Sequence, residues 1–119
     1  MIEKNKAIIR KVNEAFAADD TEGILFHVAD DIRWVVAGFS TAVGKEAFRE
    51  EIHNEAFEGA PVIKIINEIG EGDFVAVEGT VLATLKGGQS LPLLFHNTYR
   101  LENGKIKEMT SYVVPEKTN

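Results

Sequence analysis

The sequence predicts a single α+β domain, residues 1–119, in which three N-terminal helices pack on a strongly curved, mainly antiparallel sheet to form a cone-shaped barrel. Two observations predict this fold. Residues 73–114 contain long runs of alternating apolar side chains, as in β-strands. The residues before them carry apolar side chains at three- and four-residue spacing, as in helices. Because strands of this length cannot leave both faces in water, we expect the helices to cover one face.

Three long strands are predicted at residues 74–85, 91–101 and 106–114. Gly87-Gly88 breaks the first connection, and Asn103-Gly104 supplies the positive φ angles that a tight hairpin turn requires. Period-two alternation places one set of side chains on each face of the sheet. One such set comprises Val75, Val77, Val81, Ala83 and Leu85 of the first strand, and another comprises Phe95, Asn97, Tyr99 and Leu101 of the second.

Helices and shorter strands are predicted before this sheet. The predicted elements, in order, are a helix at 2–18, a short helix capped by Asp20 or Thr21 and ending around 29–31, a strand at 32–37, a loop at 38–44, a helix from Gly44 to about Phe57, and a strand at 62–69. The short helix is expected to carry Ile24, Leu25 and Val28 on its apolar side.

Composition argues against several classes of function. The formal charge of −6 and the pI near 5.0 provide no basic surface for nucleic acid. No apolar run approaches the roughly 18 residues of a membrane span, and the N-terminal residues lack the apolar segment of a signal peptide. There is no cysteine, and the three histidines lack the spacing of metal ligands. We therefore expect a cytoplasmic protein without a metal or another cofactor.

Four residues are predicted to bind a ligand: Trp34, Asn97, Tyr99 and Ser111. They bring hydrogen-bonding groups to parts of the sheet predicted to face the helices, where a polar group needs a side chain, water or a ligand as its partner. Packing with water-filled gaps is the alternative. Replacing Asn97 with leucine is accordingly expected to leave stability nearly unchanged or to improve it, while weakening the binding of any ligand by about tenfold or more.

The ionisable residues indicate a functional site less clearly. Glu78 is expected on the outer sheet face, paired across strands, and Asp30-Asp31 is expected to end a helix. Which of Glu78, His27 and His96 faces the interior is left open by the sequence, whereas His53 is expected to be exposed.

Four segments carry a resemblance to a known superfamily. They are residues 20–31 (Asp-Thr-Glu-Gly-Ile-Leu-Phe-His-Val-Ala-Asp-Asp), 44–52 (Gly-Lys-Glu-Ala-Phe-Arg-Glu-Glu-Ile), 72–79 (Gly-Asp-Phe-Val-Ala-Val-Glu-Gly) and 103–106 (Asn-Gly-Lys-Ile). In this order they resemble the nuclear transport factor two-like superfamily, which includes ketosteroid isomerases and SnoaL-like polyketide cyclases. The resemblance spans nearly the whole chain. It implies a cone that encloses a cavity for a small, mostly apolar molecule, and a homodimer formed through the outer sheet face.

The resemblance implies that residues of the family's enzymes are replaced here. The base and the tyrosine of ketosteroid isomerases fall at Val36 and Val12, and their second oxyanion donor falls at Asn97. Ser111 stands about where many relatives have an acidic residue, and Arg100 alone represents the Asp-Arg-Asp set of limonene-epoxide hydrolases. We predict binding of a small hydrophobic molecule, with isomerase- or cyclase-like proton transfer as a further expectation. The alternative is a non-catalytic ligand-binding or dimerisation module.

The outer sheet face is predicted to form the homodimer interface. Its mixture of side chains is too apolar for a surface fully exposed to water and too polar for a core. The residues concerned are Glu78, Thr80, Leu82 and Thr84 of one strand and His96, Thr98 and Arg100 of the next.

Overall fold

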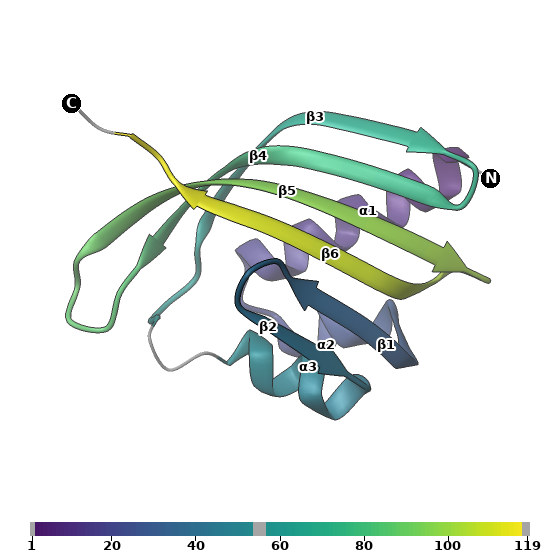
Figure 1. The fold of residues 1–119 in the computed structure, drawn as a ribbon, viewed down its shortest axis with the longest axis horizontal. Coiled ribbons are helices and arrows are strands. Elements are labelled where there is room, and N and C mark those ends of the chain that lie inside the picture. Colours follow the sequence, from purple (N-terminus) through teal and green to yellow (C-terminus); the bar gives the residue numbers. More distant parts are fainter. Residues whose placement is uncertain (1, 54–56, 118–119) are drawn as a thin grey trace.

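Helices packed against a six-stranded mixed sheet make up the structure, which confirms the predicted α+β class (Figure 1). The computed structural model describes residues 2–53 and 57–117. The helices are α1 (Ile2–Ala17), α2 (Thr21–Phe26) and α3 (Lys45–Ile52). The strands are β1 (Val28–Val36), β2 (Ser40–Val43), β3 (Val62–Glu71), β4 (Phe74–Thr84), β5 (Ser90–Glu102) and β6 (Lys105–Pro115). They are arranged in the order β2-β1-β6-β5-β4-β3, with β1 and β6 parallel and the other neighbours antiparallel.

The three long strands predicted from the alternation are confirmed as β4, β5 and β6, which pair with one another in sequence order. Asn103 and Gly104 have φ angles of 52° and 78°, and Glu102 pairs with Lys105 across their two-residue turn. Positive φ at both turn positions matches the right-handed twist of the flanking strands. Asparagine and glycine adopt this conformation at lower cost than other residues, which explains why they occupy the turn.

The core lies between the inner face of the sheet and the helices. Val75 and Val77 on β4 and Tyr99 on β5 are completely buried, as the alternation predicts. Ile9 and Val12 of α1 belong to the same buried cluster, and Figure 1 shows α1 crossing behind the long strands. Burial of one such aliphatic side chain stabilises the fold by roughly 1.5–3 kcal/mol. This apolar contact therefore fixes how α1 lies across the sheet.

The start of α2 agrees with the prediction. The Asp20 carboxylate accepts a hydrogen bond from the Gly23 amide N–H at 3.0 Å, so Asp20 is the N-cap. None of the helices in the described parts of the chain, 2–53 and 57–117, has both the length and the apolar character needed to cross a membrane.

The end of α2 differs from the prediction. The helix stops at Phe26, and Val28 is the first residue of β1. Asp30 and Asp31 lie within β1, so the expectation that they end a helix is wrong, as is the expected start of this strand at residue 32. Val28 pairs in parallel with Ile106 of β6 and is only 1% exposed. Pairing with a distant strand and burial thus outweigh the helical spacing of the local sequence.

A strand replaces the loop predicted at residues 38–44. Ser40–Val43 forms β2, which pairs antiparallel with β1 after a tight turn in which the Phe39 N–H donates to the Val36 carbonyl oxygen at 2.9 Å. β-branched Thr41 and Val43 favour an extended conformation. Four residues are too few for alternation to reveal a strand.

The third helix is shorter than predicted. α3 ends at Ile52, with an exposed His53 at its C-cap. Residues 54–56, which the prediction included in the helix, lie outside the described residues. Phe57 forms an isolated β-bridge with Leu85, so the predicted extension to Phe57 is wrong.

Candidate functional site

A hollow of about 200 Å³ lies on the inner face of the sheet, between the sheet and the C-terminal half of α1. We call it the inner hollow. Its lining is mostly apolar and comes from α1, β1, the start of β3, and β4 to β6. The lining residues are Asn13, Phe16, Trp34, Val36, Pro61, Ile63, Val81, Phe95, Asn97, Met109, Ser111 and Val113.

Strand register explains why residues distant in sequence meet in the inner hollow. Asn97 of β5 pairs with Ser111 of β6, which in turn pairs with Val36 of β1. One pair of residues further along the strands, Tyr99 pairs with Met109, which pairs with Trp34. Because successive side chains of a strand alternate between the two faces, these two rows, which are two residues apart, point to the same face of the sheet. The parallel pairing of β1 with β6 therefore brings Trp34 beside Ser111.

The indole of Trp34 is fixed by two contacts. Its Nε1–H donates a hydrogen bond to Ser111 Oγ at 2.9 Å, and Ser111 is 4% exposed. The indole also packs against Phe48 of α3, with ring centroids 4.7 Å apart. A tryptophan whose only donor is satisfied in this way presents a rigid apolar wall to the hollow.

A buried tyrosine forms a hydrogen bond with the side chain of Asn97. The Asn97 Nδ2 group donates to the Tyr99 hydroxyl oxygen at 3.1 Å. Tyr99 is completely buried, and this burial raises the pKa of its hydroxyl to about 12, although the hydrogen bond from Asn97 acts in the opposite direction. The phenol is therefore neutral at physiological pH.

The oxygen of the Asn97 amide differs from the nitrogen in its hydrogen bonding. Asn97 Oδ1 is buried and has no hydrogen-bond partner within residues 2–53 and 57–117. A buried acceptor without a partner costs roughly 1–3 kcal/mol. The amide that lines the inner hollow thus has an unused hydrogen-bonding capacity.

The structure brings together three of the four residues predicted to bind a ligand. Trp34, Asn97 and Ser111 line the inner hollow, whereas Tyr99 lies beneath Asn97 and contacts it through the hydrogen bond. That these residues bind a ligand stays a prediction. Val36, the position of the isomerase base in the resemblance, also lines the hollow.

Sequence reasoning missed the contribution of α1 and β3 to the lining. Asn13 and Phe16 come from the last turns of α1, Pro61 lies just before β3, and Ile63 lies at the start of β3. Phe16 belongs to the apolar stripe of the first helix, which indicates a residue facing the sheet. The stripe does not indicate which turn of the helix lies over a hollow.

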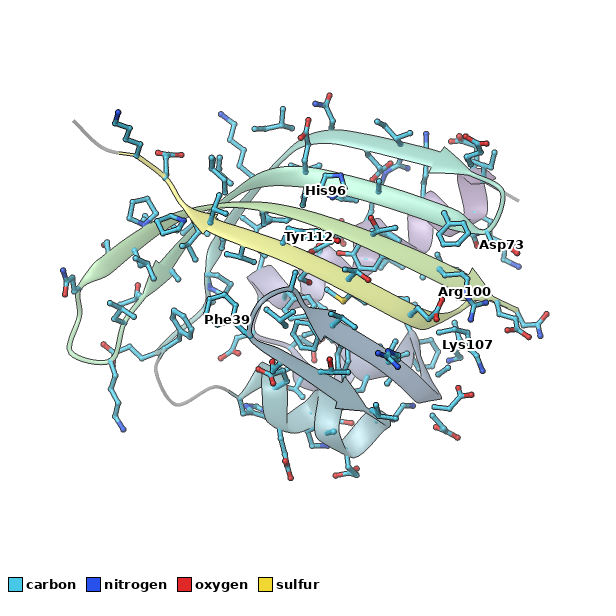
Figure 2. All side chains as sticks on the ribbon, in the orientation of Figure 1. Phe39, Asp73, His96, Arg100, Lys107 and Tyr112 are labelled. Atoms are coloured by element: carbon cyan, nitrogen blue, oxygen red, sulfur yellow. The ribbon has the colours of Figure 1, made fainter. Side chains whose placement is uncertain are left out.

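The ionisable residues considered from the sequence lie away from the inner hollow. Glu78 and His96 are exposed and pair across β4 and β5, and Asn67 of β3 donates to the Glu78 carboxylate. Figure 2 shows His96 beside Tyr112 on the face of the sheet opposite α1. The expectation that Glu78 lies on the outer face is therefore confirmed. Within the described residues, no group of three or more His, Cys, Asp or Glu side chains is arranged to hold a metal ion.

His27 lies at the end of α2, outside both the core cluster and the lining of the inner hollow. Its pKa is lowered, first by partial burial and then by the positive charges of Lys105 and Lys11. Lys105 itself lies over the Phe26 ring at 4.4 Å and donates to the Phe26 carbonyl oxygen. The lowered pKa favours the neutral form of His27 at physiological pH.

A second hollow adjoins the first. It has a volume of about 190 Å³, and we call it the outer hollow. Phe16, Pro61 and Val81 line both hollows. The rest of its lining comprises Asp19, Ile24, Ile52, Phe57, Glu58, Gly59, Ala83, Thr84 and Leu93. The two carboxylates, Asp19 and Glu58, are exposed side chains.

Comparison with known proteins identifies the family and related structures. A model of the SnoaL-like domain matches residues 9–109. A nuclear transport factor two-like protein of unknown function from Burkholderia pseudomallei superposes with a TM-score of 0.83 at 26% identity, over 91% of this chain and 88% of that one. An LEH-like epoxide hydrolase from M. tuberculosis gives 0.84 at 16% identity, over 95% and 84%. TerC, co-crystallised with polyporic acid, gives 0.80 at 24% identity, over 95% and 92%. A search of curated proteins found no match.

Proposed function

Because the chain belongs to the SnoaL-like domain family, we propose that it binds a small, largely apolar and uncharged molecule in the inner hollow, within a cone formed by the helices and the curved sheet. The ligand carries a hydrogen-bond donor that meets Asn97. Trp34 forms one apolar wall of this site, and Ser111 fixes the orientation of its indole.

One observation carries this proposal: the Asn97 side chain lines a mostly apolar hollow, and its amide oxygen has no hydrogen-bond partner among the residues that the structure describes. Binding sites for small molecules typically combine apolar walls with a few placed polar groups. The size of the hollow limits the ligand. An apolar protein cavity of about 150 Å³ holds benzene, so about 200 Å³ suits a molecule with one ring or a chain of comparable size.

The lining favours binding over proton transfer. General acid–base catalysis requires an ionisable group within hydrogen-bond reach of the substrate. Among the described residues that line the inner hollow, none is ionisable near neutral pH. Tyr99, which is hydrogen-bonded to Asn97, keeps its proton because its pKa is about 12. Isomerase- or cyclase-like chemistry is therefore the less favoured candidate.

The proposal is tested with two isomeric ligands. Hexan-1-ol and 1-methoxypentane have the same composition, but only the alcohol donates a hydrogen bond. Trp34 is the only tryptophan in the sequence, so its fluorescence reports occupancy of the hollow directly. We expect the alcohol to bind about tenfold more tightly than the ether, the equivalent of one hydrogen bond. Equal binding, or no saturable signal with either compound, would contradict the proposal.

Matched variants on β1 locate the binding. Val36 lines the inner hollow, whereas its neighbour Val35 faces the opposite side of the sheet. Val36→Phe is expected to abolish binding of hexan-1-ol, and Val35→Phe to leave it unchanged. Native mass spectrometry of the purified protein gives an independent test, because a co-purifying compound should be displaced by hexan-1-ol in the wild type.

We also propose that the outer sheet face forms a homodimer. Exposed apolar side chains on this face support the proposal, with Leu82 at 42%, Leu94 at 39% and Tyr112 at 54% exposure. Tyr112 pairs with His96, and Leu94 and Leu82 lie further along β5 and β4 from the polar pair Glu78 and His96. This combination of an apolar surface with hydrogen-bonding groups is typical of interfaces between proteins.

A further inference from the structure

The inner and outer hollows share one wall. Phe16, on the last turn of α1, Pro61, just before β3, and Val81, on β4, line both of them. A residue that lines two hollows lies at the place where they meet. The two spaces are therefore adjacent, and three apolar side chains form the boundary between them.

Each hollow alone is smaller than a usual binding site. They measure about 200 and 190 Å³, below the roughly 300–1,000 Å³ typical of ligand pockets. Taken together they reach that range. The boundary residue Phe16 is only partly buried, and its side chain packs at the edge of the core cluster and not at its centre.

We propose that the two hollows are compartments of one elongated site, so that the ligand is a long apolar molecule with its polar group at Asn97 and its tail in the outer hollow. This inference rests on the proposed function of the inner hollow. Phe16 then determines specificity, because its ring sets the width of the passage between the compartments. The tail end of the ligand is not an anion, since Asp19 and Glu58 line the outer hollow and would repel it.

The apolar character of the outer hollow predicts how affinity depends on chain length. Ile24, Ile52, Ala83 and Leu93 are among the apolar residues that a tail would contact there. Each methylene transferred from water to such a surface increases affinity by a factor of about four. A chain confined to the inner hollow would gain nothing once that hollow is full, whereas a chain that enters the outer hollow continues to gain.

The test compares hexan-1-ol with decan-1-ol on variants that fill only the outer hollow. Ala83 is 9% exposed and lines the outer hollow alone. Ala76 lies on the same strand with the opposite parity, so Ala76→Leu is a matched control on the outer sheet face. Leu93→Phe fills the outer hollow from β5 and serves as a second variant if Ala83→Leu fails to fold.

In the wild type we expect decan-1-ol to bind at least tenfold more tightly than hexan-1-ol. Ala83→Leu and Leu93→Phe should remove this preference by weakening decan-1-ol at least tenfold, with hexan-1-ol affinity unchanged within twofold, and Ala76→Leu should have no effect. If the two filling variants weaken both alcohols equally, or neither, the inference is wrong and the inner site stands. If the wild type fails to bind hexan-1-ol, the proposed function is wrong, and the inference that rests on it is wrong as well.

Discussion

The side-chain amide of Asn97 donates a hydrogen bond to the hydroxyl of Tyr99, two residues further along the same strand. The amide and the hydroxyl thus serve as hydrogen-bond partners for each other. Tyr99 is completely buried, so water cannot replace the amide as the partner of its hydroxyl. This pair changes the expectation that Asn97→Leu leaves stability unchanged, because the substitution would leave a buried hydroxyl without its partner.

We expect Asn97→Leu to lower the free energy of unfolding by about 1–3 kcal/mol, the cost of an unpaired buried hydroxyl. Tyr99→Phe alone leaves the amide more fully unpaired and should cost a similar amount. The double variant removes both groups and should be more stable than the sum of the two single effects predicts. Urea denaturation of the four proteins measures this coupling. Additive effects would show that the hydrogen bond makes no net contribution.

The same double variant separates stability from binding. If Asn97 accepts a hydrogen bond from the ligand, hexan-1-ol should bind about tenfold more weakly to Asn97→Leu/Tyr99→Phe than to the wild type. The affinity for 1-methoxypentane, which donates no hydrogen bond, should remain the same or increase. A parallel loss for both compounds would instead indicate that the shape of the hollow has changed.

The raised pKa of Tyr99 predicts a loss of stability at high pH. The folded-state pKa is about 12 and the unfolded value is 10.0, so the unfolded chain loses this proton first as the pH rises. The contribution of Tyr99 is complete below pH 10 and declines between pH 10 and 12, by up to about 1.4 kcal/mol per pH unit. Tyr99→Phe should remove this part of the decline.

Steroid isomerisation should be near background. Val12 is buried in the core and Val36 lines the inner hollow, so neither position implied by the resemblance supplies a base or an oxyanion donor. Each of those groups typically contributes a factor of about a hundred or more. A ketosteroid assay measures this directly. Robust turnover that persists in a variant lacking both His96 and Glu78, which lie on the outer face, would refute the prediction.

Sedimentation at micromolar concentration should show a species of twice the 13.1 kDa chain mass. Leu94→Glu places a charge on the outer sheet face beside Val114, where both side chains are more than one-third exposed, and should shift the equilibrium toward monomer. Phe26→Glu, at an exposed residue of α2, is the control and should sediment as the wild type. A wild-type protein that remains at 13.1 kDa throughout would exclude the dimer at these concentrations.

The part of the fold that depends on local pattern was predictable from the sequence. Alternation identified β4 to β6 because each of these strands is long enough to show a period of two, and Asn103-Gly104 identified the turn between β5 and β6. β1 was only partly identified, since its first residues become a strand through pairing with β6, a contact that no local pattern encodes.

In the candidate site, too, only the features that depend on local pattern were predictable from the sequence. Parity placed Asn97 and Tyr99 on the inner face, but it could not distinguish the residue that lines the hollow from the one buried beneath it. That difference depends on where α1 crosses the sheet. Asn13 and Phe16 enter the lining for the same reason, because the crossing point selects one turn of the helix.

The contact between Trp34 and Ser111 joins residues 77 positions apart, and β1 takes its place in the sheet only beside β6. During synthesis, β6 is the last of the described strands to leave the ribosome. Until then the nascent chain lacks the part of the lining that β6 supplies, and β5 has only β4 as a neighbour in the sheet. Contacts of such long sequence separation slow folding. A ligand able to bind only the completed site would therefore act after translation, by stabilising finished molecules, and could not guide the growing chain.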